Sequence, residues 1–354
     1  MARGAKLFLC LDEVLYICSL KNLTTLMNQD MQTILTFKPY YKNVLWGGGR
    51  IARFKGCMIP IDTLGESWEV SDMEGGRSVV ADGPLEGLSI TDLIKRYGDD
   101  FLGTGVDTRR FPLLVKLIDA HQRLSLQVHP DDILAARLHN APGKSEMWYV
   151  LEAEPGAKIY CGLTRSITPE EFDRMASDGS ILDVVNSYEV SPGQFYDIPA
   201  GTLHAIGSGC LLAEIQQPAD ITYRVFDYNR LDSTGLPRTL HLDLARQAMR
   251  FEQPAAVRLD ASPDSNDGRI KSVGNPYFTV RHISLQGPED SLRIDSDGET
   301  FGIFLIASGE ARLEIENGTA RSAGAGISLL VPAAVRTVTL SGNATVLYVT
   351  PRTA

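Results

Sequence analysis

Short segments of alternating hydrophobic and polar residues, separated by Gly and Pro, recur along most of the chain. These segments are rich in β-branched and aromatic residues, as is typical of strands in a sandwich or barrel. In the middle of the chain this pattern predicts strands within 111–120, 123–130, 146–153, 157–163, 193–199, 204–209, 210–217 and 221–228. We therefore predict a mainly β fold.

A few segments have the pattern of helices instead. In the first, SITDLIKRYGDDFLG (89–103), Ser89 or Thr91 is expected to cap the helix. The second lies within 167–188, where Thr168 is the expected cap and Pro169 occupies the first turn. The third lies within 241–253. The expected architecture is thus a β fold with a few helical additions.

A loop rich in Asp, Ser and Pro, LDASPDSNDG, follows the third helix and indicates a linker. On this basis we expect four parts, of which the first matches no strand pattern: an N-terminal extension of unclear role (1–30), a larger β domain with helical insertions (31–254), a linker (255–265) and a second β domain (266–354).

Composition and charge exclude several classes of function. The chain has 34 basic and 44 acidic residues and a net charge of −10, which argues against nucleic acid or an anionic membrane as the main partner. No run approaches the ~18 apolar residues of a membrane span. The five cysteines are scattered and form no CxxC pair, so we expect neither disulfides nor a thiolate metal site, and a cytoplasmic location.

The candidate site begins with the stretch LSLQVHPDD (124–132). Residues two apart share one face of a strand, so Gln127 and His129 point the same way. Together with Glu146 and His204 on other predicted strands, His129 forms a 2-His-1-carboxylate set suited to Zn²⁺ or Fe²⁺, and the Gln127 amide oxygen could be a fourth ligand. The alternative is that each is an ordinary core residue satisfied by backbone partners.

Other ionisable residues occupy positions on the same strands. Lys144 lies two residues before Glu146, and Glu214 and Arg224 lie on the faces of two later strands. Ionised groups that point into a barrel are costly unless they are paired or used. A structural salt bridge between Arg224 and Glu214 is the alternative to a functional role.

The second β domain loosely repeats the first: FGIFLIASGEARLEIENG parallels EMWYVLEAEPGAKIYCGL. In this repeat Phe301 stands where Glu146 does, and Arg336 or Thr337 where His204 does. We therefore expect the second domain to bind no catalytic metal.

Four blocks, LSLQVHPDD, GKSEMWYVL, IPAGTLHAIG and EIQQPADITYRVFDYNR, resemble the motifs of the type I phosphomannose isomerases, also called mannose-6-phosphate isomerases, in their shorter bacterial form. The resemblance extends from about residue 34 to the C-terminus and is strongest from 124 to 230. It implies two cupin-type (jelly-roll) barrels, the first of which carries the metal site. It also implies a zinc-dependent enzyme that interconverts mannose 6-phosphate and fructose 6-phosphate.

The resemblance also implies roles for individual residues. By motif position, the ligands of one Zn²⁺ per chain would be Gln127, His129, Glu146 and His204. Arg224 would be an active-site cation, and Asp220 and Glu214 match polar positions of the family's site. One departure is that longer members carry His-Lys-Pro-Glu where this chain has Gly143-Lys144-Ser145-Glu146, so a histidine acid/base at the first position is missing.

An aldose-ketose isomerase moves a proton between C1 and C2 through a cis-enediol. Lys144 is our candidate for proton transfer between the sugar oxygens, and either Asp220 or Glu214 for the carbon base. The candidates for binding the substrate phosphate are Arg224, Lys144 and the hydroxyl of Ser125.

Two other classes of protein fit the same residues. An Fe²⁺ oxygenase uses the same ligand triad, and a non-catalytic cupin can bind a sugar with the same polar groups. No sequence feature indicates an oligomeric state.

Overall fold

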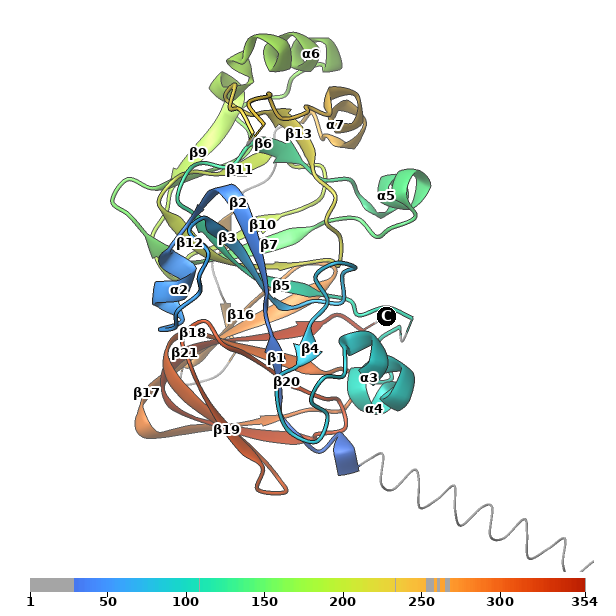
Figure 1. Cartoon of the computed structure of the whole chain (residues 1–354), viewed down its shortest axis with the longest axis vertical. Helices are drawn as coiled ribbons and strands as arrows, with labels where there is room; N and C mark the ends of the chain where they lie inside the picture. Colours follow the sequence, from blue (N-terminus) through green and yellow to red (C-terminus); the bar gives the residue numbers. More distant parts are fainter. Residues whose placement is uncertain are drawn as a thin grey trace, which may run out of the picture.

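The computed structural model describes residues 29–107, 109–232, 234–252, 258–259, 262–264 and 268–353. The expected extension (1–30) and linker (255–265) therefore lie largely outside the described residues. In the described part the strands form three antiparallel sheets, two in the upper half of Figure 1 and one in the lower half. The prediction of a mainly β fold with a few helices is confirmed.

The two upper sheets pack face to face as a barrel. In hydrogen-bonded order, the larger sheet contains β14 (Arg258–Leu259), β10 (Phe195–Ile198), β7 (Glu146–Ala153), β12 (Cys210–Gln216), β5 (Leu114–Ala120), β3 (Leu64–Val70) and β2 (Tyr40–Gly48). The smaller sheet contains β13 (Tyr223–Phe226), β6 (Leu126–Val128), β11 (His204–Ile206), β8 (Lys158–Leu163) and β9 (Val185–Glu189). Trp148 of β7 and Ile206 of β11 belong to one buried cluster between them.

The lower sheet is formed mainly by the C-terminal part of the chain. It contains β15 (Ser262–Pro263), β16 (Ile270–Gly274), β17 (Phe278–Asp295), β21 (Thr337–Pro351), β18 (Gly302–Ile315), β20 (Ser328–Val331), β1 (Leu35–Lys38) and β4 (Val79–Val80), with β19 (Ala320–Gly324) paired to β18. β1 and β4 come from the N-terminal part: β1 pairs with β20, and β4 pairs with the other edge of β1 (Figure 1). The domain boundary after residue 254 stays a prediction. Strands from both sides of this boundary nevertheless share sheets, since β1 and β4 belong to the lower sheet and β14 belongs to the larger upper sheet.

The long strands of the lower sheet curl around a buried cluster of their own and form a second barrel (Figure 1). Strand β7 shows how the two barrels meet. Trp148 and Val150 face the interior of the upper barrel, whereas Met147 and Tyr149 belong to a second buried cluster that includes Phe278 of β17. Because both faces of β7 are covered, the segment EMWYVL is buried throughout instead of alternating with exposed residues. Glu146 shares the inward face with Trp148.

The helices predicted within 89–103, 167–188 and 241–253 begin where expected but are shorter, and the helix over Arg50–Phe54 was not predicted. The described helices are α2 (Arg50–Phe54), α3 (Ile90–Tyr97), α4 (Asp99–Leu102), α5 (Asp132–His139), α6 (Pro169–Asp178) and α7 (Leu242–Ala248), with a 3₁₀ turn η1 (Ser180–Val184). Ser89 caps α3 in a capping box, and Thr168 does the same for α6. The prediction of a single helix over 89–103 is wrong, because Gly98, at a φ of 50°, separates α3 from α4.

Helix α5 was absent from the sequence-based prediction. Asp131 caps it by accepting a hydrogen bond from the backbone N–H of Leu134, and Asn140 ends it in the left-handed conformation. Its apolar stripe is weak: Leu134 and Ala135 are buried, whereas Ile133 and Leu138 are exposed. This explains why hydrophobic periodicity did not reveal it.

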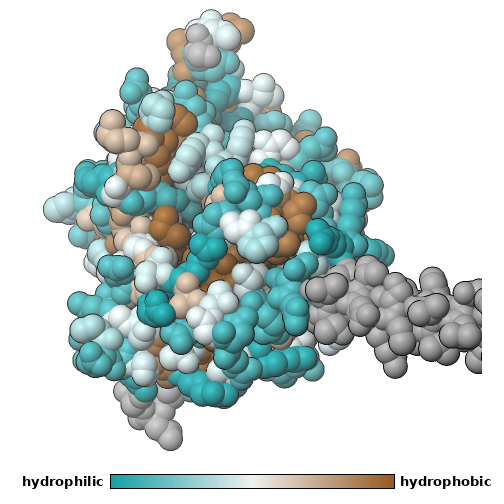
Figure 2. Space-filling view, turned by 60° about the horizontal axis from the view of Figure 1, so that its bottom comes forward, coloured by the Kyte–Doolittle hydropathy of each residue, from teal (hydrophilic) through white to brown (hydrophobic). Residues whose placement is uncertain are grey.

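The molecular surface is mixed in character. On the face drawn in Figure 2, hydrophobic residues occur in small patches among hydrophilic ones. Within the described residues, no helix is both long and apolar enough to cross a membrane.

Candidate metal centre and active site

Three short strand ends bring the candidate ligands together inside the upper barrel. His129 follows the last residue of β6, Glu146 is the first residue of β7, and His204 is the first residue of β11. His204 is directly opposite Gln127 in the pairing of β11 with β6. Residues separated by up to 75 positions therefore meet because the two sheets of the barrel face each other.

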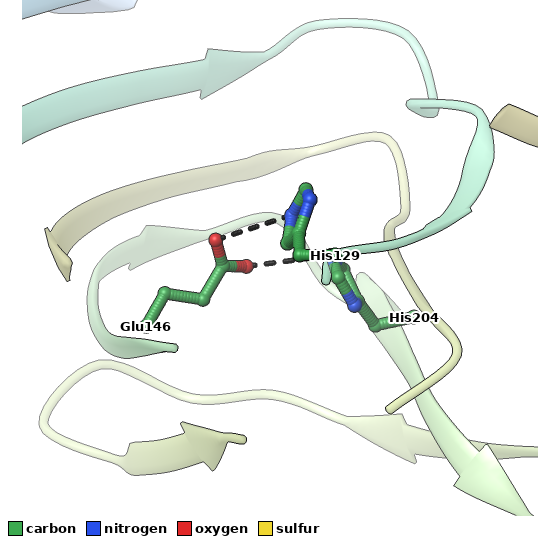
Figure 3. A group of neighbouring side chains, drawn as sticks. All are labelled: His129, Glu146 and His204. Carbon is green, nitrogen blue, oxygen red and sulfur yellow. Dashed lines mark ion pairs between the residues drawn. The ribbon is translucent and has the colours of Figure 1, made fainter. Parts of the chain in front are cut away.

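The two imidazoles converge on one carboxylate (Figure 3). Nε2 of His129 lies 3.4 Å from Oε2 of Glu146, and Nε2 of His204 lies 3.4 Å from Oε1. The ligand atoms of all three residues lie within 4.8 Å of one another, and all three side chains are buried. The structure thus brings together the triad that the sequence singled out.

The hydrogen bonds around the triad suit a cation. Nδ1 of His129 donates to the carbonyl oxygen of Ile221 (2.7 Å), and Nδ1 of His204 donates to that of Thr202 (2.8 Å). Because a carbonyl can only accept, both Nε2 atoms keep their lone pairs. Among the described residues, no donor meets the geometry of a hydrogen bond to either carboxylate oxygen of Glu146. Two nitrogen lone pairs and an unsatisfied carboxylate therefore fit a divalent metal ion.

The charges in the site follow from its burial. Burial lowers the pKa of His129 to about 3, with a further contribution from the charge of Lys144, so the ring is neutral at physiological pH. Burial also lowers the pKa of His204. Burial by itself would raise the pKa of Glu146, but the positive charge of Lys144 holds that pKa well below its usual value. Neutral imidazoles and an ionised carboxylate are the protonation states that metal ligation needs.

Gln127 and Lys144 border the triad on its open side. Nε2 of Gln127 lies 3.3 Å from Nε2 of His204, and turning the amide over would present its oxygen instead. Nζ of Lys144 lies 3.1 Å from Nε2 of His129 and 3.1 Å from Oε2 of Glu146. The ammonium group is therefore in direct contact with two members of the triad.

A cavity of about 300 Å³ opens beside the triad, with Gln127 and Lys144 in its wall. Its ionisable lining consists of five basic and three acidic residues: Lys42, Lys116, Lys144, Arg224, Arg238, Glu66, Glu214 and Asp220. The hydroxyl-bearing residues Ser125 and Thr222 also line it. The lining therefore has an excess of positive charge in a chain whose net charge is −10, as an anionic ligand requires.

The structure does not pair Arg224 with Glu214. Nζ of Lys116 lies 3.1 Å from Oε1 of Glu214, and Nε1 of Trp148 donates to the other carboxylate oxygen at 3.0 Å. Arg224 donates from one terminal nitrogen to the carbonyl oxygen of Thr239 (2.7 Å), and its buried Nε has no hydrogen-bond partner among the described residues. The alternative of a structural Arg224–Glu214 salt bridge is therefore wrong.

Lys116, which the sequence analysis did not single out, is part of this site. It is buried in β5 between Glu214 and Glu66, and Nζ is 3.6 Å from Oε2 of Glu66. Burial opposes its charge, but the two carboxylates raise its pKa. A lysine in the middle of the apolar segment LLVKLIDA was the available signal, because a charged residue on a buried strand needs a partner.

Asp220 and Glu214 differ in their surroundings. Asp220 pairs with Lys42 at 3.1 Å. Burial would raise the pKa of Asp220, but the charges of Lys116 and Lys42 lower it. Burial raises the pKa of Glu214, and the negative charge of Glu146 adds to this effect. Both carboxylates line the cavity, and Glu214 is the more basic of the two.

Comparison with known proteins shows the family to which the chain belongs. Residues 34–155 match the family model of the phosphomannose isomerase type I catalytic domain. The mannose-6-phosphate isomerase of Streptococcus mutans serotype c is 34% identical over 275 residues, which cover 77% of this chain and 84% of that protein. Mannose-6-phosphate isomerase ManA of Bacillus subtilis is 40% identical over 209 residues, 59% of this chain and 65% of its own length.

The solved structures give the same result for the fold. The crystal structure of the mannose 6-phosphate isomerase from Bacillus subtilis matches with a TM-score of 0.81 at 33% identity, covering 90% of this chain and 99% of that chain. Fold and triad together define a cupin-type β protein with a candidate metal site. The chain belongs to the type I phosphomannose isomerase family, and it is an isomerase.

Proposed function

We propose that the chain is a zinc enzyme that interconverts D-mannose 6-phosphate and D-fructose 6-phosphate through a cis-enediol. The observation that carries this proposal is the buried His-Glu-His triad, with its unsatisfied carboxylate, next to a cavity lined by an excess of cations. Membership of the family supports the substrate, because the names of the relatives described above specify an isomerase of mannose 6-phosphate.

His129, Glu146 and His204 would hold the metal, and Gln127 is the candidate for a fourth ligand. When bound, Zn²⁺ would supply Lewis-acid stabilisation of negative charge on the sugar oxygens. The two backbone carbonyls behind the histidines orient both rings for this role.

The remaining residues of the cavity divide the other tasks. Lys144 contacts His129 of the triad and also lines the cavity, and it would move a proton between the two sugar oxygens. Arg224, Arg238 and the hydroxyl of Ser125 line the same cavity and would bind the phosphate. In this proposal the positive charges of Arg224 and Arg238 balance the negative charge of the substrate phosphate.

The carbon base is one of two carboxylates. Glu214 is buried, pairs with Lys116 and is the more basic, whereas Asp220 is the weaker base, pairs with Lys42 and is 43% exposed. Exchange of the transferred hydrogen with deuterium oxide separates them. The variant, Glu214→Gln or Asp220→Asn, that binds metal normally but loses this exchange identifies the base.

The C-terminal barrel is proposed to have a structural role and no catalytic metal. Phe301, which parallels Glu146 in the sequence repeat, is fully buried and stacks on Phe111 with ring centroids 4.9 Å apart. An aromatic ring cannot replace a carboxylate ligand. We therefore expect one zinc ion per chain.

A coupled assay with mannose 6-phosphate, before and after treatment with a chelator, tests the proposed function. We expect turnover that chelation abolishes and added zinc restores, and elemental analysis should show one zinc per chain that His204→Ala loses. Absence of turnover by the zinc-loaded protein would contradict the isomerase proposal. Iron content together with oxygen uptake would favour an oxygenase instead.

A further inference from the structure

The segment Gly143–Glu146 carries two residues of the candidate site, and its backbone is fixed by several hydrogen bonds. The N–H of Lys144 donates to the carbonyl oxygen of Pro130 (3.0 Å), and the N–H of Ser145 donates to Oε1 of Gln217 (2.9 Å). The N–H of Ala200 donates to Oγ of Ser145 (3.1 Å). The positions of Lys144 and Glu146 therefore depend on the neighbours of this segment.

Asp132, at the start of α5, joins these contacts. Its Oδ1 accepts a hydrogen bond from the N–H of Gly143 (2.8 Å) and another from Nε2 of Gln217 (2.9 Å). Gln217 is the residue that also holds Ser145. One carboxylate oxygen thus fixes the beginning of the segment directly and its middle through a single intermediate side chain.

The other oxygen of Asp132 is bound from the C-terminal barrel. The hydroxyl of Tyr277, in the turn between β16 and β17, donates to Oδ2 at 2.7 Å. Burial, together with this hydrogen bond to Asp132, raises the pKa of Tyr277 to about 12, so the hydroxyl keeps its proton.

Asn275 fixes the turn that carries Tyr277. Its Oδ1 accepts from the N–H of Tyr277 (3.0 Å), and its Nδ2 donates to Oδ1 of Asp197 on β10 (3.1 Å). Asp197 is directly opposite Met147, the neighbour of Glu146, in the pairing of β10 with β7. The turn therefore contacts the upper barrel on both sides of the segment that carries Glu146.

We propose that Tyr277, a residue of the barrel without the candidate site, is a positioning residue that holds Lys144 and Glu146 in place through Asp132. This inference rests on the proposed function for its catalytic readout. Through Tyr277 the C-terminal barrel would help to position Lys144 and Glu146, in addition to covering the upper barrel. Tyr277 itself lies outside the cavity lining.

The test compares Tyr277→Phe with Tyr97→Phe. The hydroxyl of Tyr97 donates to Asp30 at 2.9 Å, so each variant loses one tyrosine–aspartate hydrogen bond, but Tyr97 lies in α3, away from the site. Both full-length proteins are measured for Tm, kcat, KM and zinc affinity by competition with a chromogenic chelator. Mutation of a group that directly supports a metal ligand typically lowers metal affinity or activity by about 10- to 100-fold. Because Tyr277 is one contact further from the ligands, we expect Tyr277→Phe to lower zinc affinity and kcat by about 3- to 10-fold.

Asp132 variants strengthen the comparison. Asp132→Ala removes the acceptor for Gly143, Gln217 and Tyr277 together, so it should exceed the effect of Tyr277→Phe. Asp132→Asn keeps the Oδ1 acceptor, so it should recover much of the loss. Equal kcat and zinc affinity in Tyr277→Phe and Tyr97→Phe would overturn the proposal, even if both lower Tm. Failure of the proposed function is distinguishable, because wild-type protein would then not isomerise mannose 6-phosphate while the zinc affinities still report on Tyr277.

Discussion

Glu146 is a fully buried carboxylate for which the described part of the chain offers no hydrogen bond at either oxygen, and its neighbours His129 and His204 are buried as well. An ionised group in this environment is costly unless a cation compensates it. Lys144 supplies one positive charge at 3.1 Å, and a metal ion would supply the rest. The electrostatics of these few residues lead to a prediction for the protein without metal.

Acid should destabilise the chelated protein through His129. Its pKa is lowered from 6.5 to about 3 in the folded state, so below pH 6.5 the unfolded chain binds the proton more readily. Stability is therefore fully present above about pH 6.5 and is lost as pH falls toward about 3, by about 1.4 kcal/mol per pH unit for this group. Urea unfolding of chelated wild type and His129→Gln from pH 7 to 5 measures this difference. Parallel stability curves for the two proteins would contradict it.

The proposed role of Arg224 also depends on a single residue, through its guanidinium group. Its side chain lines the cavity, and burial together with the nearby Arg238 lowers its pKa, so an anion beside it would relieve the repulsion. We expect Arg224→Ala to lose ~2 to 5 kcal/mol of transition-state stabilisation, roughly 30- to 4,000-fold in kcat/KM. Zinc content should persist, and Arg224→Lys should recover part of the activity. Near-normal kcat/KM with a lowered Tm would show that the residue is structural.

At the scale of elements, the contact between the start of α5 and the segment that precedes β7 depends on Gly143. A Cβ added there would lie 2.6 Å from the backbone of Asp131 and Asp132, although the Gly143 backbone is outside the left-handed region. Gly143→Ala should therefore displace the segment that carries Lys144 and Glu146, at a cost of about 1 to 3 kcal/mol in stability. Zinc affinity and kcat should fall with it.

Gly49→Ala is the matched control for this prediction. A Cβ at Gly49 meets nothing within 4 Å, and its φ of −107° suits alanine. This substitution should leave zinc affinity and kcat unchanged. If Gly143→Ala has the same zinc affinity and kcat as Gly49→Ala, the contact between α5 and the segment before β7 does not determine the geometry of the site.

At the scale of the molecule, the two barrels share one buried cluster that includes Phe301 of the lower barrel, Phe101 of α4, and Leu117 and Tyr149 of the upper barrel. The three tryptophans, Trp46, Trp68 and Trp148, lie on strands of the upper barrel. Their fluorescence therefore reports on a barrel that does not contain Phe301.

Phe301→Ala should destabilise both barrels together. Removing this fully buried ring costs about 3 to 5 kcal/mol by creating a cavity. If the molecule unfolds as one unit, the tryptophan fluorescence midpoint in urea should shift as far as the far-UV circular dichroism midpoint. An unchanged fluorescence midpoint would show that the barrels unfold independently.

The sequence alone determined the local features of this protein. Strand periodicity predicted the mainly β fold, and Ser89 and Thr168 marked the starts of α3 and α6, because capping depends on residues only three apart. The triad was also recognisable, since His129, Glu146 and His204 each stand at a strand end with a polar side chain that a barrel interior must satisfy.

Only the tertiary structure decided which distant groups meet. Lys116 pairs with Glu214, 98 residues away, in place of the Arg224 that strand faces suggested, because strand order in the sheet sets β5 beside β12. β1 pairs with β20 across almost the whole chain, and Tyr277 reaches Asp132 from 145 residues away. Strand periodicity specifies on which face of a strand each residue lies, but it does not specify which strands are neighbours. The order of strands depends on how the whole chain buries both faces of sheets such as the one that contains β7.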